Sequence, residues 1–265
     1  MEVQEMKPLF NSSDKKVIFF DLYDTIIDRD LSFTQALKTS LEEFTARWDS
    51  EEWNPTRAVD AYEKEWVRRA ISIRRAKGVK ASSKKRQLIQ TKEQRQLYCL
   101  TKALQDSPFD VTSSFLRILL KRTKELARSK PILFSDVKHT LEQLKQQKYT
   151  LALISNGKRE RLIQALKYVQ LDPIFPNHTV IAPSSPRTRK PHQSIFHKAL
   201  KTMEIKPHQA IMVGNSWKSD IFGGNRCGID TVWIQPKNQK IHLKRIGRNR
   251  VVTIARFKQL GALFN

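Results

Sequence analysis

Four separate groups of residues in this chain combine side-chain types that suit chemistry on a phosphorylated compound. The groups are Asp21–Thr25, Ser155-Asn156-Gly157, Lys190-Pro191 and Gly214–Asp220. A carboxylate such as that of Asp21 can attack phosphorus and form an acyl phosphate. The other groups add hydroxyl and amide donors, a cation and further oxygen ligands. Together they contain the parts needed for phosphoryl transfer to water.

Each group has an expected role. A carboxylate and a phosphate repel each other, so we expect a magnesium ion to bridge them, with Asp220 placed to share that ion. A helix start after Ser155 offers amide donors and a hydroxyl to phosphate oxygens. Lys190 would neutralise charge on the nucleophile and on the transferring group. We therefore predict a set of catalytic residues, Asp21, Ser155 and Lys190, and a set of phosphate-binding residues, Thr25, Asn156 and Gly157.

Hydrophobic patterning predicts the elements that position these groups. The run Val17–Phe20 is typical of a short, fully buried strand. Further strands are predicted over 151–154, 179–182, 210–213, 230–234 and 251–254, and helices over 137–144, 158–168 and 192–203, with a turn at Gly223-Gly224. Strands that alternate with helices favour an α/β fold with a doubly wound parallel sheet. Ligands bind such a sheet at the carboxyl ends of its strands, where the four groups fall.

Residues 30–130 have a different pattern. Apolar residues recur at helical spacing from Phe33 to Trp48. A second helix is predicted to start at Asn54-Pro55-Thr56, and further helices to run over about 84–104 and 111–127. The pattern gives no convincing strand. We therefore predict a core formed by residues 15–29 plus 131–265, with a helical domain, 30–130, inserted after the first strand.

Composition limits the class of protein. Hydrophobic residues make up 39% and charged residues 28% of 265 residues, which is typical of a globular chain with a real core. The longest apolar runs are far shorter than the roughly 18 residues that span a membrane. The first residues contain no apolar signal core, and two cysteines form no disulfide framework. These features predict a cytoplasmic protein with reduced thiols and no membrane contact.

The charge balance is strongly basic. Forty-nine Lys and Arg residues against 26 Asp and Glu residues give a formal net charge of +23. Residues 67–86 include nine Lys and Arg residues and no Asp or Glu, and no Asp or Glu follows Asp230. Such a field attracts polyanions and phosphorylated ligands, although solvated helix faces explain the same charges. A small anionic phosphorylated substrate is therefore expected, and nucleic acid is a possible partner.

In this order, the four groups resemble the motifs of the haloacid dehalogenase-like (HAD) hydrolase superfamily, over residues 15–29 and 131–235. The resemblance implies a Rossmann-like core, a helical cap domain that selects the substrate, magnesium dependence and, in most members, hydrolysis of a phosphomonoester. It also implies the metal ligands, which are Asp21, the backbone carbonyl of Tyr23, Asn215 and Asp220.

Two positions depart from the family's phosphatases. Tyr23 stands where they carry a second Asp as acid and base, and Asn215 stands where many carry Asp. A phenol with a pKa of about 10 is a poor base at neutral pH. The dehalogenase branch, which needs no metal, often has Tyr at this position. Three interpretations stay open: a magnesium-dependent phosphatase with weak activity, which we favour; a haloacid dehalogenase-type hydrolase; and a polyanion- or RNA-binding protein on the HAD fold.

Overall fold

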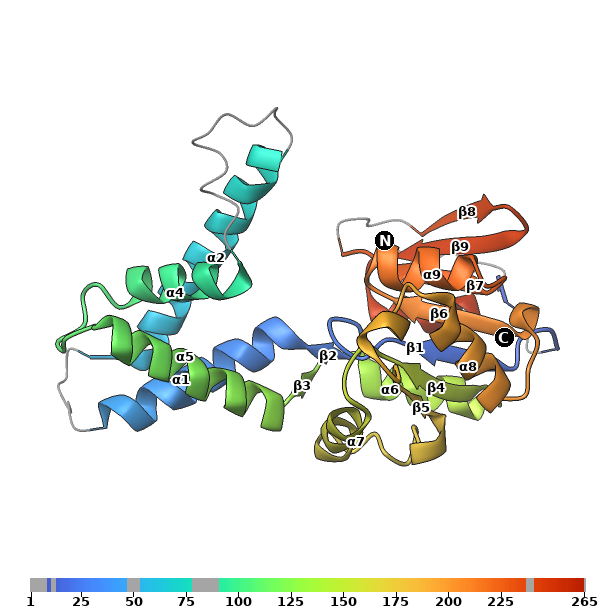
Figure 1. Ribbon diagram of the computed structural model, residues 1–265, viewed down its shortest axis with the longest axis horizontal. Helices are drawn as coiled ribbons and strands as arrows, with labels where there is room; N and C mark the ends of the chain where they lie inside the picture. The colour runs from blue at the N-terminus through green and yellow to red at the C-terminus, as the bar shows by residue number, and fades with distance from the viewer. Residues whose placement is uncertain (1–8, 11–12, 47–52, 78–90, 237–240, 265) are drawn as a thin grey trace. The chain divides into compact units, whose positions relative to one another are not determined.

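The computed structural model describes residues 9–10, 13–46, 53–77, 91–236 and 241–264, and the chain divides into two units (Figure 1). One unit consists of Met1–Arg29 and Pro131–Asn265, and the other of Asp30–Lys130. The second unit is therefore an insertion within the chain of the first.

The first unit contains a seven-stranded sheet with the order β5-β4-β1-β6-β7-β9-β8. In chain order its strands are β1 (Val17–Phe20), β4 (Thr150–Ile154), β5 (Val180–Ile181), β6 (Ala210–Gly214), β7 (Asp230–Ile234), β8 (His242–Ile246) and β9 (Asn249–Ile254). All neighbouring strands are parallel except β8 and β9. The predicted parallel α/β sheet is confirmed. The edge strand β8 was not predicted, because all five of its side chains are exposed and leave no apolar pattern.

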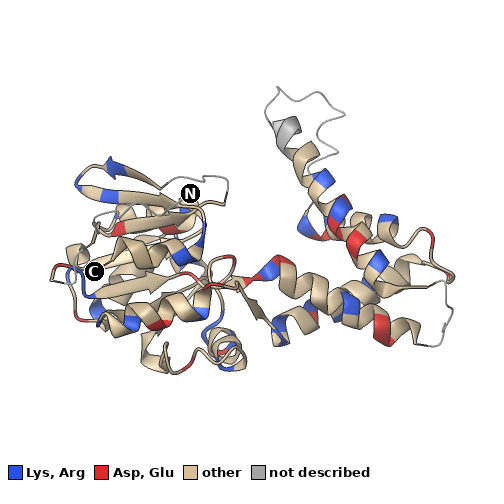
Figure 2. Cartoon of the chain, turned by 180° about the vertical axis from the view of Figure 1, so that it is seen from behind, with Lys and Arg blue, Asp and Glu red and all other residues tan. Residues whose placement is uncertain are grey.

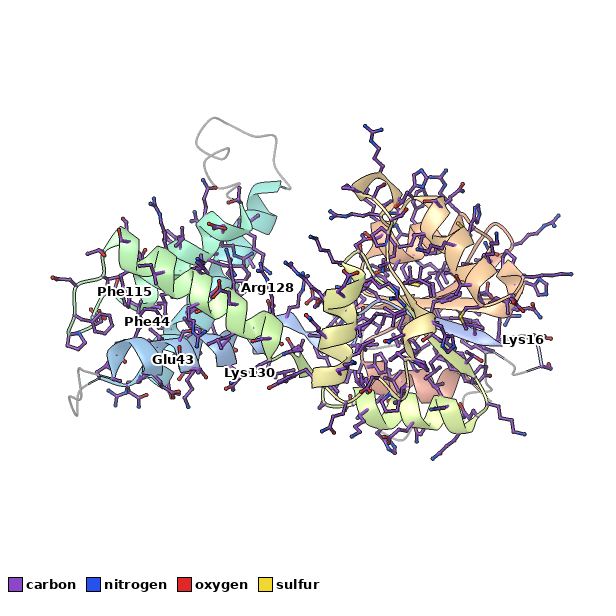
Figure 3. All side chains as sticks on the ribbon, turned by 60° about the horizontal axis from the view of Figure 1, so that its bottom comes forward. Lys16, Glu43, Phe44, Phe115, Arg128 and Lys130 are labelled. Carbon is purple, nitrogen blue, oxygen red and sulfur yellow. The ribbon has the colours of Figure 1, made fainter. Side chains whose placement is uncertain are left out.

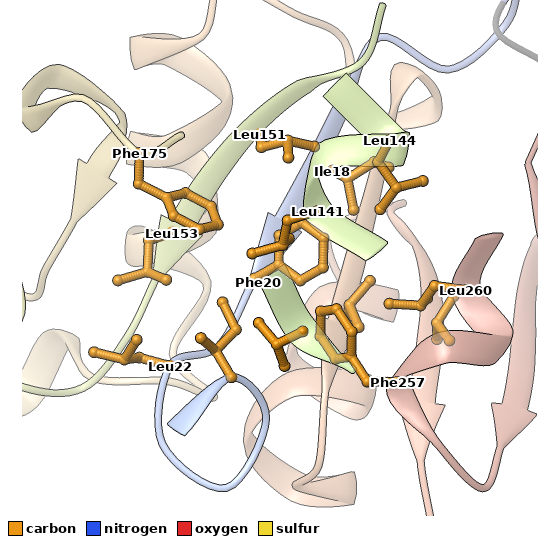
Figure 4. Packing of buried hydrophobic residues seen from close by; sticks show 14 of the residues in the cluster. Ile18, Phe20, Leu22, Leu141, Leu144, Leu151, Leu153, Phe175, Phe257 and Leu260 are labelled. Atoms are coloured by element: carbon orange, nitrogen blue, oxygen red, sulfur yellow. The ribbon is translucent and has the colours of Figure 1, made fainter. Parts of the chain in front are cut away.

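Helices cover both faces of this sheet (Figure 1). One face carries α6 (Val137–Gln146), α7 (Arg159–Tyr168) and the 3-10 helix η5 (Phe257–Leu263), and the other carries α8 (Gln193–Thr202). Ile18 and Phe20 of β1 pack among the residues of α6 and η5 (Figure 4), whereas Val17 and Phe19 pack with Phe196 of α8. The four-residue apolar run of β1 is thus explained by burial on both faces.

The register brings three strand ends to one level. Phe20 of β1 is paired with Leu153 of β4 and with Val213 of β6. The residues that follow these three strands therefore meet at one edge of the sheet. A two-stranded antiparallel pair, β2 (Ile27–Asp28) and β3 (Ile132–Leu133), stands where the chain leaves and re-enters the first unit.

The second unit consists of helices α1 (Arg29–Thr45), α2 (Pro55–Lys77), α4 (Lys92–Ala103) and α5 (Ser113–Ser129), of which α1 begins one residue before the unit. It contains a hydrophobic cluster of its own, with Leu37, Leu100 and Leu119 among the buried residues. The rings of Phe44 and Phe115 pack edge to face, with their centroids 5.9 Å apart (Figure 3). As predicted, the described residues of this unit contain no strand.

Two local predictions need correction. The helix expected over 84–104 begins at Lys92, because Thr91 and Gln94 form a capping box there; residues 84–90 and Trp48 lie outside the described residues. The turn expected at Gly223-Gly224 is wrong. These residues begin the short helix α9 (Gly223–Asn225), which follows the π-helix η4 (Trp217–Phe222). A Cβ at Gly223 would lie 2.8 Å from the Phe196 ring, so glycine here allows close helix packing.

Among the described residues, no helix is both long and apolar enough to cross a membrane. Lys and Arg residues occur along both units, including the hairpin of β8 and β9 (Figure 2). There Arg245 stands directly opposite Arg250, whose guanidinium donates to the Leu9 carbonyl. Most of the basic stretch 67–86 lies outside the described side chains, so polyanion binding stays a prediction.

Both cysteines are buried free thiols.

Candidate active site

The ammonium group of Lys190 joins two carboxylates that follow different strands. Lys190 Nζ donates to Asp21 Oδ1 at 2.8 Å, to Asp220 Oδ1 at 2.7 Å and to the Ile154 carbonyl at 2.6 Å. All three of its N–H donors are therefore used. Lys190 and Asp220 are 5% and 1% exposed. Three of the sequence-predicted residues, Asp21, Lys190 and Asp220, thus share one contact set at the ends of β1, β4 and β6.

Burial and charge act in opposite directions on this cluster. Burial disfavours the ammonium ion, but the carboxylates of Asp21 and Asp220 outweigh it and raise the pKa of Lys190. Burial also raises the pKa of Asp220, opposed by Lys190 and reinforced by the Asp21 charge. Two carboxylates and one ammonium leave one net negative charge. The Lys190 ammonium therefore holds the two carboxylates together, and the remaining negative charge would attract a further cation.

Asn156 fixes the backbone of Lys190. The Lys190 backbone N–H donates to Asn156 Oδ1 at 2.7 Å, and Asn156 Nδ2 donates to the Lys190 carbonyl at 3.1 Å. The amide side chain of Asn156 is thus used in positioning the lysine. The phosphate-binding prediction for Asn156 consequently rests on its backbone amide. The Asn-Lys pairing was not predictable, because 34 residues separate the partners.

Gly214, at the end of β6, makes room for the Asp220 carboxylate. A Cβ at Gly214 would lie 2.4 Å from Asp220 Cγ. The second oxygen of Asp220, Oδ2, accepts the Ser216 N–H at 2.9 Å. The π-helix η4 brings Asp220 back over the strand end, and the Asn215 carbonyl accepts Trp233 Nε1 at 3.0 Å. Sequence reasoning identified Asp220 and Asn215 but missed that glycine is required before them.

The loop after β1 places Asp21 at the sheet edge. The Asp21 N–H donates to the Val213 carbonyl at 2.9 Å, which extends the β1–β6 pairing by one residue. The Asp21 side chain is 13% exposed, and its Oδ2 makes no hydrogen bond with the described part of the chain. Thr25 is buried, and within the same part its hydroxyl has no hydrogen-bond partner. Ser155 is also buried, and its N–H donates to the Ile181 carbonyl.

Tyr23 and Asp24 occupy the next positions in this loop. The Tyr23 ring packs against the hydrophobic core, and its Cε2 lies 3.7 Å from where a Cβ at Gly157 would stand. Asp24 has a left-handed backbone with φ of 60°. Both of its carboxylate oxygens accept from the Arg29 guanidinium, with Nε at 2.9 Å from Oδ1. The Asp24–Arg29 pair, five residues apart in the sequence, was not predicted.

The oxygen atoms that follow β1 and β6 are the kind of donor that magnesium takes. The described residues contain no group of three or more His, Cys, Asp or Glu side chains that could hold a metal ion. Asp21 and Asp220 are two carboxylates, and the Asn215 amide and Tyr23 carbonyl are further oxygens. Mg²⁺ prefers oxygen ligands and is commonly held by one or two carboxylates together with substrate phosphate and water. The residues therefore fit Mg²⁺, with a smaller acidic set than a closed metal cage has.

Comparison with known proteins identifies the family. The profile of the haloacid dehalogenase-like hydrolases matches residues 15–228. The chain belongs to this family of hydrolases, as its four motifs indicated. Two solved structures share the fold: a dehalogenase in an intermediate complex (19% identity, TM-score 0.56, covering 95% of this chain and 97% of that one) and a magnesium-bound HAD-hydrolase of Bacillus subtilis (18%, TM-score 0.53, covering 93% and 97%).

Curated relatives match over shorter segments. A glyceraldehyde 3-phosphate phosphatase of Pyrococcus furiosus is 38% identical over 96 residues, covering 36% of this chain and 39% of the relative. The pyrophosphatase PpaX of Bacillus cereus is 32% identical over 98 residues, covering 37% and 44%. The matches thus span about two-fifths of these relatives' lengths.

The buried ion cluster predicts unequal effects of two substitutions. Lys190→Met leaves two carboxylates without their cation and should lower the free energy of unfolding by about 3–5 kcal/mol. Asp220→Asn keeps the Lys190–Asp21 pair but can no longer accept from both Lys190 and the Ser216 N–H, so it should cost less, about 1–3 kcal/mol. Urea denaturation in metal-free buffer measures both. A loss in Asp220→Asn as large as that in Lys190→Met would contradict this account.

The pH dependence of that stabilisation follows from the raised pKa of Lys190. The folded state holds the proton more tightly than the unfolded state, whose lysine pKa is about 10.4. The stabilising contribution should therefore be complete below that pH and decline as the pH rises through the folded-state value. Unfolding free energies of wild type and Lys190→Met should converge at strongly alkaline pH and differ by a constant amount between pH 7 and 9.

Close packing at Gly214 predicts that a side chain at this position destabilises the fold. Gly214→Ala forces the Asp220 carboxylate to move and should cost about 1–3 kcal/mol of unfolding free energy, as overpacking does. Gly261→Ala is the matched control, because its Cβ would meet only the flexible end of the Gln143 side chain, at 3.2 Å. Chemical denaturation of the two variants provides the comparison, and equal losses would show that Asp220 yields freely.

Proposed function

We propose that this hydrolase is a magnesium-dependent phosphatase of a small anionic substrate, with Asp21 as its nucleophile. The observation that carries the proposal is the Lys190 bridge, which holds one oxygen of Asp21 and leaves the other without a partner in the described chain. An anchored carboxylate with one available oxygen suits attack on phosphorus. The names of the curated relatives, a phosphomonoester phosphatase and a pyrophosphatase, support phosphorylated substrates.

The residues around Asp21 would divide the work. Asp21 Oδ2 attacks phosphorus, and the phosphorylated aspartate is then cleaved by water. Lys190 holds Asp21 in place and offsets charge on the reacting carboxylate. Asp21, Asp220, Asn215 and the Tyr23 carbonyl would hold Mg²⁺, which when bound supplies the positive charge that lets carboxylate and phosphate approach. Ser155, Thr25 and the backbone amides of Asn156 and Gly157 would bind the phosphate oxygens.

The helical unit, Asp30–Lys130, fits a role in choosing the substrate. It is inserted between two segments of the hydrolase core and contains its own hydrophobic cluster, so its surface can vary without disturbing the sheet. We infer that it serves as the cap domain of this enzyme.

The nucleophile is tested by Asp21→Asn. An amide cannot attack phosphorus as a carboxylate does, so phosphate release should fall to background on a panel of phosphorylated metabolites with Mg²⁺. The fold should persist, because Lys190 keeps Asp220 as its partner. Full activity in a folded Asp21→Asn protein would refute covalent catalysis by Asp21. Chloride release from a haloacid without metal, in the same wild-type preparation, would favour the dehalogenase interpretation.

The metal ligands are tested by magnesium titration of phosphatase activity. Asp220→Ala should raise the Mg²⁺ concentration for half-maximal rate by at least about 10–100-fold, the loss seen when even an outer partner of a metal ligand is removed. Asn215→Asp adds a formal charge beside the ion and should lower that concentration. Asp136→Asn, at the start of α6, is the control, because the Asp136 side chain makes no capping hydrogen bond there. Superimposable curves for wild type and Asp220→Ala would contradict the proposed ligand set.

A further inference from the structure

The leaving group of a phosphate ester presents a requirement that the site must meet. When Asp21 attacks phosphorus, the bond to the leaving oxygen breaks and that oxygen takes the electron pair. An alkoxide is a poor leaving group, so alkyl esters are cleaved efficiently only if an acid protonates that oxygen. The question is which described residue around Asp21 can give this proton at neutral pH.

The buried ion cluster has no proton to give. Lys190 uses all three of its N–H groups on Asp21, Asp220 and the Ile154 carbonyl. Asp220 accepts from Lys190 on one oxygen and from the Ser216 N–H on the other. A proton transfer from either residue would dismantle the contacts that hold Asp21.

The loop after Asp21 offers no acid in their place. Tyr23 is a phenol, whose ordinary pKa of about 10 lets it donate a hydrogen bond but makes it a weak acid at pH 7. Asp24, the nearest carboxylate in sequence, is turned by its left-handed backbone and bound through both oxygens by Arg29. Arg29 therefore occupies both oxygens on which Asp24 could carry a proton. Asp28 lies beyond this loop, in strand β2.

We propose that this enzyme acts on phosphoryl compounds whose leaving group departs as a stable anion, namely phosphoric anhydrides, acyl phosphates and aryl phosphates, in preference to alkyl phosphomonoesters. The proposal rests on the phosphatase function proposed above and specifies its substrate class. Its basis is the juxtaposition of a fully engaged Lys190, an Asp24 bound by Arg29 and a phenol at position 23.

The steps balance without an added co-reactant. The Asp21 carboxylate forms an oxygen–phosphorus bond while the bond from phosphorus to the leaving oxygen breaks, and the leaving group departs as phosphate, carboxylate or phenolate. Water then attacks the phosphorus of the aspartyl phosphate. The bond between phosphorus and the Asp21 oxygen breaks, inorganic phosphate is released, Asp21 is again a carboxylate, and the proton of the water goes to solvent.

The experiment measures how turnover of the full chain depends on the leaving group, at saturating Mg²⁺. The substrates are a series of substituted phenyl phosphates, acetyl phosphate, pyrophosphate and glycerol phosphate. We expect kcat/KM to fall steadily as the leaving-group pKa rises, with glycerol phosphate about 10²–10⁴-fold below the most acidic phenol ester, the factor that a general acid usually supplies. The comparison uses kcat/KM because every substrate forms the same aspartyl phosphate, whose hydrolysis contributes equally to kcat for all of them.

Substitutions at position 23 separate the missing proton from a change of shape. Tyr23→Asp and Tyr23→Asn shorten the side chain equally, but only Asp can carry a proton. Tyr23→Asp should raise the rate on glycerol phosphate relative to phenyl phosphates, whereas Tyr23→Asn should not. Asp24→Asn should keep the wild-type ratio of alkyl to aryl turnover, because Asp24 is bound to Arg29 and gives no proton. Circular dichroism verifies that each variant is folded.

The outcomes are distinguishable. Equal kcat/KM on alkyl and aryl esters would overturn the proposed substrate class while leaving the phosphatase function standing. Selective loss of alkyl turnover in Asp24→Asn would overturn it too, by identifying Asp24 as the acid. No phosphate release from any substrate by the folded protein would refute the phosphatase function and this proposal with it. A steep leaving-group dependence that flattens in Tyr23→Asp alone would establish it.

Discussion

The contact on which the site depends is that of the Lys190 ammonium with two carboxylates, in a largely buried position. Charges are costly to bury, and two carboxylates this close repel each other unless a cation stands between them. Lys190 supplies that cation and also satisfies the carbonyl at the end of β4. Three strand ends thus become one unit, because none of the contacts at Lys190 can be lost without leaving a buried charge or carbonyl unsatisfied.

Much of the surrounding structure serves to keep this lysine in place. The Asn156 side chain hydrogen-bonds both the backbone N–H and the backbone carbonyl of Lys190. Gly214 leaves space for the Asp220 carboxylate that a side chain at position 214 would occupy. The strands β1, β4 and β6 end at the same level of the sheet, and this register fixes the separation of the groups that the Lys190 ammonium contacts. The site is therefore built on strands rather than on a movable loop. This favours a fixed position for Asp21, as the proposed attack on phosphorus requires.

The parts of this arrangement that follow from local patterns could be predicted, and those that depend on distant pairing could not. Val17–Phe20 is short, apolar and followed by Asp21, which is enough to place a carboxylate at a strand end. The α/β fold followed from the alternation of such strands with helices. The Asn156–Lys190 bonds leave no trace in a sequence, because any Asn and Lys at that separation would look the same. The helix start at Lys92 depended on a two-residue capping box inside a longer helical pattern, and the exposed strand β8 had no apolar side to reveal it.

The strong positive charge of the chain and the negative charge of its site act at different stages. A net charge of +23 raises the rate at which anionic substrates reach the protein, and salt screens it beyond about 8 Å at physiological ionic strength. At Asp21, however, two carboxylates outnumber one ammonium, so an arriving phosphate meets local repulsion. The distant charges cannot remove that barrier, because only groups in contact with the reacting atoms act through a low dielectric. A bound cation at Asp21 and Asp220 would remove it, so the proposed requirement for a metal ion is compatible with a chain that is rich in Lys and Arg.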